Sequence, residues 1–176
     1  MYCQLTIFIV GIIVVILFCI VIPKIDTNDR SPIEFNITGA SITQFNLTSN
    51  NILYYKFKIN ITVRNPNNNN CKEFYKMTTA ISSYKKQEFG WGTVDPFVLG
   101  SMNTISLKPV KFEGHSVIKL EPEQVVEYKI ETQLGFYNLS LELETTSPSL
   151  HCSDFIVPLI SKGDEIVPPF NVTQCL

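Results

Sequence analysis

Apolar and polar residues alternate along much of the chain, and the clearest example is the segment 55–64. Every second residue from Tyr55 to Val63 is apolar, and the residues between them are lysine, asparagine and threonine. This two-residue period predicts a strand with one face on a core and the other in water. We expect Asn65-Pro66-Asn67 to end the strand, because proline has no N–H to continue the ladder and asparagine tolerates left-handed backbone. The asparagine run 67–70 is then a loop.

Shorter runs of the same kind predict further strands, separated by prolines and glycines at the spacing expected of a sandwich. No stretch beyond Ile22 shows a 3.6-residue period, and Glu121–Val126 is expected to hold one helical turn at most. The fold class that follows is all-β, an Ig/fibronectin-III-like antiparallel sandwich of seven to nine strands. The additional predicted strands are Ile33–Thr38, Ser41–Leu47, Met77–Tyr84, Phe89–Val94, Thr104–Phe112, Val125–Leu134, Phe136–Glu144 and His151–Ile160.

The N-terminus has a different pattern, because Leu5–Ile22 carries no charge and 15 of its 18 residues are Ile, Leu, Val or Phe. As a helix it would be roughly 27 Å long, close to the ~30 Å hydrocarbon core of a bilayer. We therefore expect a transmembrane helix. A cleaved signal peptide is the alternative, but it needs a basic start, a shorter apolar stretch and small residues at the cleavage site. The expected organisation is a tail (1–4), the span (5–22), a stalk (23–32) and a β-domain (33–176).

Two signals disagree on which side of the membrane the β-domain lies. Lys24 and Arg30, mixed with Asp26 and Asp29, weakly favour the cytosol. Five Asn-x-Ser/Thr sequons favour the exterior instead, because each asparagine lies between apolar neighbours and would face solvent on a strand, where a glycan fits. The bland alternative is that asparagine and threonine simply fill the polar face of a sheet. The sequon residues are Asn36, Asn46, Asn60, Asn138 and Asn171.

Charge and cysteine content narrow the function classes. The net charge is −2, from 14 basic and 16 acidic residues, so nothing indicates nucleic-acid binding. Of the five cysteines, Cys71, Cys152 and Cys175 lie in the β-domain. Three cysteines permit one internal disulfide with one thiol left over, and the sequence does not select the pair.

The residues that could carry chemistry do not form a catalytic pattern. Nucleophilic hydrolysis needs a nucleophile, a base and an orienting group, and the only histidines are His115 and His151. The segment His151–Asp154 is the nearest approach to a metal cluster, but sequential residues of a strand cannot converge on one ion. We predict no enzyme activity, no catalytic residue, no metal and no cofactor. Trp91, between two glycines, is interpreted as a strand-end core residue in preference to an exposed binding residue.

The order of several motifs resembles a known plant family. The carriers are the strand that ends in Asn65-Pro66-Asn67 and, farther on, Pro96-Phe97-x-x-Gly100; Tyr75 and Tyr84 lie between them at matching positions. Over about residues 33–160 the chain resembles the group-2 late embryogenesis abundant domain. With its N-terminal span it resembles more closely the harpin-induced-like and non-race-specific-disease-resistance-like membrane proteins.

This resemblance implies a β-sandwich on a single-pass anchor, with the N-terminus in the cytosol and the domain outside the plasma membrane or in the secretory lumen. It implies a non-enzymatic role in plant defence and stress responses, with the lipid bilayer and cell-surface proteins as partners. A desiccation protectant or structural membrane protein is the alternative. The chain departs from the family in having only Met1–Gln4 before the span, where members usually carry tens of residues. The segment between Gly114 and Val125 is also short.

Overall fold

The structure is a computed structural model that describes residues 31–68, 72–144, 150–160 and 170–175. All but Ser31 belong to one compact unit that begins at Pro32. Its single described helix is α2 (Pro122–Leu134). The strands are β1 (Glu34–Leu47), β2 (Ile52–Arg64), β3 (Glu73–Tyr75), β4 (Thr78–Tyr84), β5 (Gln87–Val94), β6 (Phe97–Leu99), β7 (Thr104–Ser106), β8 (Val110–Val117), β9 (Phe136–Glu144), β10 (Leu150–Pro158) and β11 (Thr173–Cys175).

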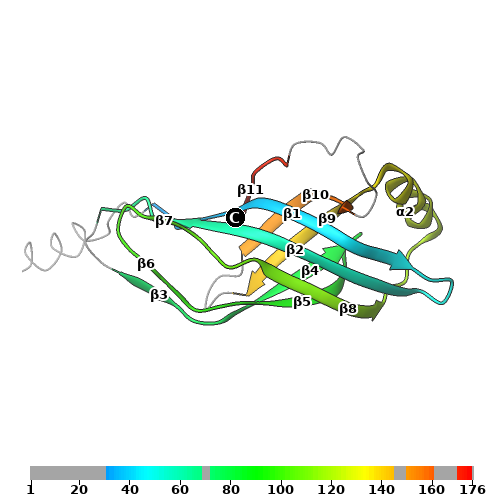
Figure 1. Ribbon diagram of the computed structural model, residues 1–176, viewed down its shortest axis with the longest axis horizontal. Coiled ribbons are helices and arrows are strands. Elements are labelled where there is room, and N and C mark those ends of the chain that lie inside the picture. The colour runs from blue at the N-terminus through cyan, green and yellow to red at the C-terminus, as the bar shows by residue number, and fades with distance from the viewer. Residues whose placement is uncertain (1–30, 69–71, 145–149, 161–169, 176) are drawn as a thin grey trace, which may run out of the picture. The chain divides into compact units, whose positions relative to one another are not determined.

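Nine of these strands form one antiparallel sheet, in the order β5-β4-β9-β10-β11-β1-β2-β7, with β8 also paired to β2. The sheet curls, so that β4 and β5 lie across the interior from β2 and β8 (Figure 1). A separate two-stranded sheet pairs β3 with β6. The all-β prediction is confirmed. The two-sheet, Ig-like sandwich stays a prediction, since the described strands of the large sheet form one continuous hydrogen-bonded path.

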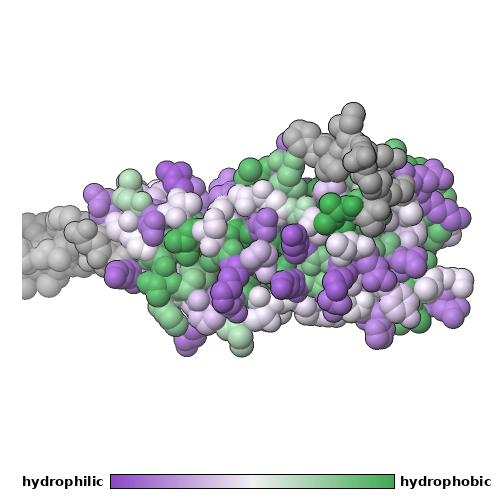
Figure 2. Space-filling model, in the orientation of Figure 1, coloured by the Kyte–Doolittle hydropathy of each residue, from purple (hydrophilic) through white to green (hydrophobic). Residues whose placement is uncertain are grey.

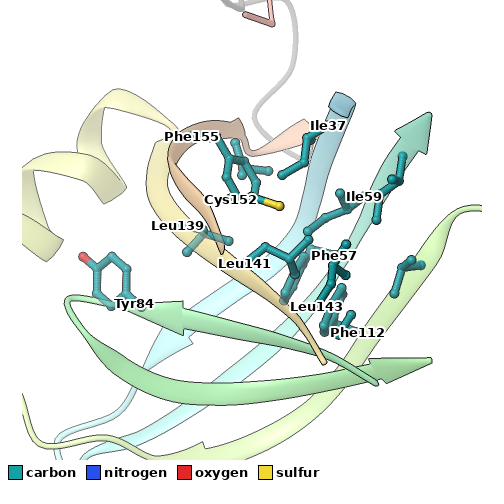
Figure 3. Packing of buried hydrophobic residues seen from close by; sticks show 14 of the residues in the cluster. Ile37, Phe57, Ile59, Tyr84, Phe112, Leu139, Leu141, Leu143, Cys152 and Phe155 are labelled. Carbon is teal, nitrogen blue, oxygen red and sulfur yellow. The ribbon is translucent and has the colours of Figure 1, made fainter. Parts of the chain in front are cut away.

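The alternation on β2 is confirmed residue by residue: Tyr55, Phe57, Ile59, Ile61 and Val63 are buried, and the lysines between them are exposed. In the interior Phe57 stacks on Phe112 of β8 with ring centroids 4.4 Å apart. Leu141 and Leu143 of β9 point toward this pair from the other side (Figure 3). Each fully buried side chain of this size contributes roughly 1.5–3 kcal/mol through removal of apolar surface from water.

Glycine allows the curled sheet to close tightly. A Cβ atom on Gly92 of β5 would come within 2.7 Å of Val110 Cγ1 and 3.0 Å of the Phe112 ring. A side chain at this position would therefore push β5 away from β8. Side-chain bonds hold the same seam together, because the Ser116 hydroxyl donates to the carbonyl of Phe89 over 2.6 Å.

The predicted strand Val125–Leu134 is wrong, because this segment is the helix α2. The limit of one helical turn within Glu121–Val126 is wrong for the same reason. Glu121 and Gln124 form a capping box, Pro122 occupies the first turn, and Gly135 ends the helix in the left-handed region at φ 76°. No residue of α2 is fully buried, so the helix lacks the strong apolar stripe that makes a 3.6-residue period visible in a sequence.

Other strand predictions need smaller corrections. The two strands expected within 33–47 are one strand with bulges near Gly39 and Thr43. The strand expected over Thr104–Phe112 is two strands, β7 and β8, because Pro109 cannot donate to a ladder. The short strands β3, β6 and β11 were not expected.

The predicted span Leu5–Ile22 lies outside the residues that the structure describes. Within the described ranges, no helix has both the length and the apolar character needed to cross a membrane.

One disulfide joins Cys152 of β10 to Cys175 of β11. The two residues face each other across the antiparallel pair, so the bond fastens the C-terminal strand to the sheet. This result selects one of the pairings that the sequence leaves open; Cys71 lies outside the described residues.

Candidate functional site

Two lysines lie directly opposite each other on the outer face of the sheet. Lys58 of β2 pairs in register with Lys111 of β8. Side chains at such positions have Cβ atoms about 4.5–5.5 Å apart, and like charges there destabilise a sheet. Neither lysine forms an ion pair with a residue that the structure describes, whereas the neighbouring Lys56 pairs with Glu113 over 2.9 Å.

The two lysines line a groove of about 310 Å³ that crosses β1, β2 and β8. Ser41 and Thr43 of β1 form its other side, and Ile160 lies at its margin. The Ser41 hydroxyl is buried and has no hydrogen-bond partner among the described residues. A buried polar atom without a partner costs stability. We therefore expect the Ser41 hydroxyl to form a hydrogen bond with water or with a ligand in the groove.

Trp91 lies on the outer face of β5. Its side chain is 55% exposed, so the interpretation as a core residue is wrong. The inward positions on either side of it are Gly90 and Gly92, which the Tyr55 and Phe112 rings cover. Trp91 lines a second hollow of about 470 Å³, and Lys111 lines both hollows.

Lys111 therefore links the two hollows, and we call Trp91, Lys111, Lys58 and Ser41 the outer strip. Its chemistry fits a partner that carries carboxylates or other anions next to a flat apolar group. Lysines supply point charges, and an exposed tryptophan supplies a large rigid contact area with little entropy cost. Lys108, at the rim, is already neutralised by Asp95 at 2.9 Å.

The five predicted sequon asparagines all avoid the core. Asn46, Asn60 and Asn171 are exposed, and Asn36 and Asn138 are partly exposed on the outward side of their strands. Asn60 lies two residues from Lys58 on the same face of β2, and its Nδ2 atom would be 3.1 Å from a Cβ placed on Gly39. Four of the five thus lie on the solvent-facing side of a strand, as expected, whereas Asn171 precedes β11 and lies in no strand. Attachment of glycans stays a prediction.

The residues of the predicted family motif come together as a structural joint. Asn65 is buried at the end of β2, and its side-chain amide donates to the carbonyl of Gly100 over 3.1 Å. The ring of Phe97 stacks on Tyr75 with centroids 4.6 Å apart. Pro66 follows Asn65 and ends the strand, while Pro96 is exposed just before β6. These residues join segments of the fold.

The two histidines lie apart from each other. The His115 ring lies 5.7 Å from that of Tyr54 on the outer face, and His151 is 3.7 Å from Glu142. No group of three or more His, Cys, Asp or Glu that could hold a metal ion occurs in the part of the chain that the structure describes.

Three plant proteins match this chain over most of its length. NDR1/HIN1-like protein 10 of Arabidopsis thaliana is 30% identical over 165 residues, covering 86% of this chain and 69% of that protein. The chain belongs to the NDR1/HIN1-like family. NDR1/HIN1-like proteins 2 and 3 of the same plant are each 26% identical, and each match covers 81% of this chain. The chain spans 64% and 66% of their lengths. No protein-family model matches it.

Membership of the NDR1/HIN1-like family confirms the resemblance drawn from the motifs. The structure separates two kinds of residue. The motif residues that carry the resemblance serve the fold, as the Asn65 joint illustrates. The outer strip was not found from the sequence, although the alternation on β2 already placed Lys58 outward. What the sequence lacks is the register that sets Lys58 opposite Lys111, 53 positions later.

A second polar cluster of this NDR1/HIN1-like chain lies where α2 meets the β4–β5 turn. The Tyr84 hydroxyl donates to Glu131 over 2.7 Å, and Lys85 bridges Glu127 at 2.7 Å and Glu131 at 2.9 Å. Burial and the bond to Glu131 raise the pKa of Tyr84 far above its ordinary value. Burial alone would lower the pKa of Lys85, but its bonds to Glu127 and Glu131 outweigh that effect and raise it. Lys85 is therefore a turn residue whose charge is paired with two carboxylates of α2.

Proposed function

We propose that this chain is a non-enzymatic, single-pass membrane protein that acts in plant defence and stress responses by binding protein partners at the cell surface. In this proposal Leu5–Ile22 spans the plasma membrane, the N-terminus is cytosolic and the β-domain lies outside. Family membership supports the defence and stress role. The sequence pattern of the apolar segment supports the anchor.

The observation that carries the binding role is the opposition of Lys58 and Lys111 beside the exposed Trp91. Two facing cations cost the sheet stability in the absence of a partner, and an acidic surface laid across them would remove that cost. The partner surface we propose is therefore an acidic segment of a protein, with an apolar group placed to cover the indole.

Membrane topology is the first test. The full chain expressed in plant cells should fractionate with membranes, and its apparent mass on a gel should fall after treatment with a glycosidase that removes N-linked glycans. The matched control is a variant in which all five sequon asparagines are replaced by glutamine. Its apparent mass should not change with the enzyme. Protection of the β-domain from external protease in intact protoplasts would contradict the external placement.

Partner binding is tested with a variant that reverses both charges of the outer strip. Proximity labelling from outside the cell should recover an acidic protein set with the wild-type chain and lose it with K58E/K111E. Lys129→Glu, a charge reversal at an exposed position of α2, is the matched control and should keep the set. Equal recovery with all three chains would remove the outer strip from the proposal.

A further inference from the structure

The small sheet of β3 and β6 presents an apolar face to solvent. Phe74 and Val98 are directly paired across the two strands, and their side chains are 66% and 50% exposed. Lys72 and Lys76 flank Phe74 at alternate positions, and both are exposed. The two lysines immediately precede and follow β3, so they place positive charge at both ends of the strand that carries Phe74. We call these four residues the β3–β6 face.

The inward side of the two strands that carry this face is packed against the core. The inward residues of the same strands pack on the core: Tyr75 stacks on Phe97, and both rings meet Phe35 at centroid distances of 6.0 and 6.5 Å. Glu73 is the acidic residue of β3, and it accepts the Tyr75 hydroxyl bond over 2.8 Å. The strands that carry the outward apolar residues are consequently anchored to the core, and the Glu73 carboxylate is directed to Tyr75.

The β3–β6 face lies at the end of the domain where the chain enters it. Phe35 is the second residue of β1, and the first residue, Glu34, pairs in register with Arg64. Asn65 then joins this end of β2 to Gly100, directly after β6. Figure 1 shows β3, β6 and β7 at one end of the domain and α2 at the other. Hydrophobic residues gather over β3 and β6 at that end (Figure 2).

Met102 adds an apolar side chain to this end. It is 65% exposed and has a φ of 49°, a left-handed conformation that non-glycine residues rarely adopt. Its N–H is held by the carbonyl of Asn67 over 3.0 Å. The fold thus fixes a large apolar residue outward in a strained turn, an arrangement typical of sites that contact a partner.

We propose that the β3–β6 face, with Met102, rests in the headgroup region of the lipid bilayer. Aromatic and aliphatic side chains flanked by lysines suit this boundary, because the apolar groups enter the acyl margin while the cations meet lipid phosphates. This inference rests on the proposed anchor. It adds an orientation of the domain, with the outer strip and α2 left accessible to partners.

The length of the connecting chain favours this occupant over others. Only 11 residues separate the end of the predicted span at Ile22 from Glu34. Even fully extended, a chain of that length reaches at most about 40 Å, so under this proposal the entry end of the domain stays near the bilayer. Tethering of this kind gives an effective concentration of about millimolar, which suffices for a contact that would be weak in a free domain.

The single tryptophan makes a depth measurement simple. The full chain is reconstituted into phosphatidylcholine vesicles containing phosphatidylglycerol, with or without brominated acyl chains that quench tryptophan. Trp91→Phe removes the native signal, and Phe74→Trp places a new reporter on the β3–β6 face. Val117→Trp in the same background is the matched control, because Val117 is exposed at the opposite end of β2, where it pairs with Ile52.

The Phe74→Trp reporter should emit at shorter wavelength than the Val117→Trp reporter and be quenched by bromolipid, while Val117→Trp should show neither effect. Val98→Trp should behave like Phe74→Trp and serves if the first variant does not fold. Adding K72E/K76E should reduce the quenching, and unchanged quenching would overturn the role given to the lysines. Equal quenching at positions 74, 98 and 117 in chains that float with the vesicles would overturn the inference and leave the anchor intact. Chains that do not float would instead overturn the anchor.

Discussion

The side-chain amide of Asn65 donates a hydrogen bond to the backbone carbonyl of Gly100 over 3.1 Å. The same side chain accepts bonds from the backbone N–H and the side-chain amide of Asn67, at 2.9 and 3.1 Å. Asn65 is 1% exposed, so these bonds replace water that cannot reach it. One buried amide thereby joins the end of β2 to the turn after β6. This bond explains why the Asn65-Pro66-Asn67 motif and Gly100, which lies 35 residues after Asn65, belong together in the fold.

Replacing Asn65 by alanine should destabilise the domain by about 2–4 kcal/mol, because it removes the bond of a buried amide to the Gly100 carbonyl and the two bonds that its oxygen accepts from Asn67. Urea unfolding followed by circular dichroism measures this loss. Asn68→Ala, at an exposed position three residues later, is the matched control and should stay within about 0.5 kcal/mol of wild type. Equal stability of the two variants would contradict the structural role of the joint.

Much of the sheet could be predicted from the sequence, because burial on one face imprints a two-residue period. This holds for β2 and β9, whose buried residues alternate without a break. The helix α2 could not be recognised in this way, since it buries no residue fully and has no apolar stripe of helical period. The sequence signals of this helix lie at its two ends: the capping pair Glu121 and Gln124 with Pro122 at the start, and Gly135 at the end. In the prediction, the apolar residues between them favoured a strand.

The candidate site was less accessible from the sequence than the fold. Alternation places Lys58 and Lys111 outward, but register between distant strands decides that they face each other. The sequence favoured a buried Trp91 because large aromatic residues usually pack in cores. The flanking glycines contain the missing information. They make room for the Tyr55 and Phe112 rings on the inner side of β5, which leaves the tryptophan on the outer side.

The disulfide between Cys152 and Cys175 should stabilise the domain by about 3 kcal/mol, because it closes a loop of 23 residues and restricts the unfolded chain. Cys152→Ala and Cys175→Ala should each lose this amount. A thiol reductant should lower the unfolding midpoint of the wild type and leave both variants unchanged. Peptide mapping without reduction should recover the two cysteines in one linked pair, and recovery of either one linked to Cys71 would contradict the assignment.

The β4–β5 turn offers a way to gain stability. Lys85 and Lys86 both have positive φ, 49° and 66°, and form a two-residue hairpin turn between the paired residues Tyr84 and Gln87. Such turns favour glycine, because a side chain strains the left-handed region. Lys86→Gly should raise the free energy of unfolding by about 0.5–1 kcal/mol.

Lys85→Gly is the informative comparison for that variant. It relieves the same strain but removes the bonds of Lys85 to Glu127 and Glu131. We therefore expect Lys85→Gly to be less stable than Lys86→Gly in the same urea titration. A larger gain from Lys85→Gly would show that the two ion pairs contribute nothing to the fold.

Tyr84 should make the domain sensitive to alkali. Its pKa lies far above the ordinary 10.0 in the folded chain, because burial and the bond to Glu131 disfavour the phenolate. The unfolded chain loses this proton near pH 10 while the folded chain keeps it, so stability is complete below that pH and falls as pH rises above it. The slope is about 1.4 kcal/mol per pH unit for each such proton.

Tyr84→Phe should therefore be less stable than wild type near neutral pH, because it loses the bond to Glu131, yet its stability should fall less steeply above pH 10. Urea midpoints measured across the alkaline range give both quantities. Tyr54→Phe, which removes the hydroxyl of an exposed tyrosine on the outer face, is the control for the loss of the bond to Glu131 and should keep wild-type stability near neutral pH. Parallel slopes for wild type and Tyr84→Phe would exclude Tyr84 as the group responsible.

The facing lysines of the outer strip should show a trade between stability and binding. Lys111→Glu places a carboxylate opposite Lys58, and this cross-strand pair should stabilise the domain by roughly 0.5–1 kcal/mol relative to the two facing cations. Lys58→Glu should do the same, while K58E/K111E restores facing like charges and should return to about wild-type stability. The double variant is consequently a fair test of binding, since its loss of partners cannot be attributed to the fold.

Unfolding of the wild type, the two single variants and the double variant in low and high salt measures the interaction between the two positions. The gain in stability of the single variants should shrink in high salt, because salt screens the Lys–Glu pair. If Lys111→Glu is instead less stable than wild type at low salt, the two lysines do not repel each other in the sheet, and the argument for an acidic partner loses its basis.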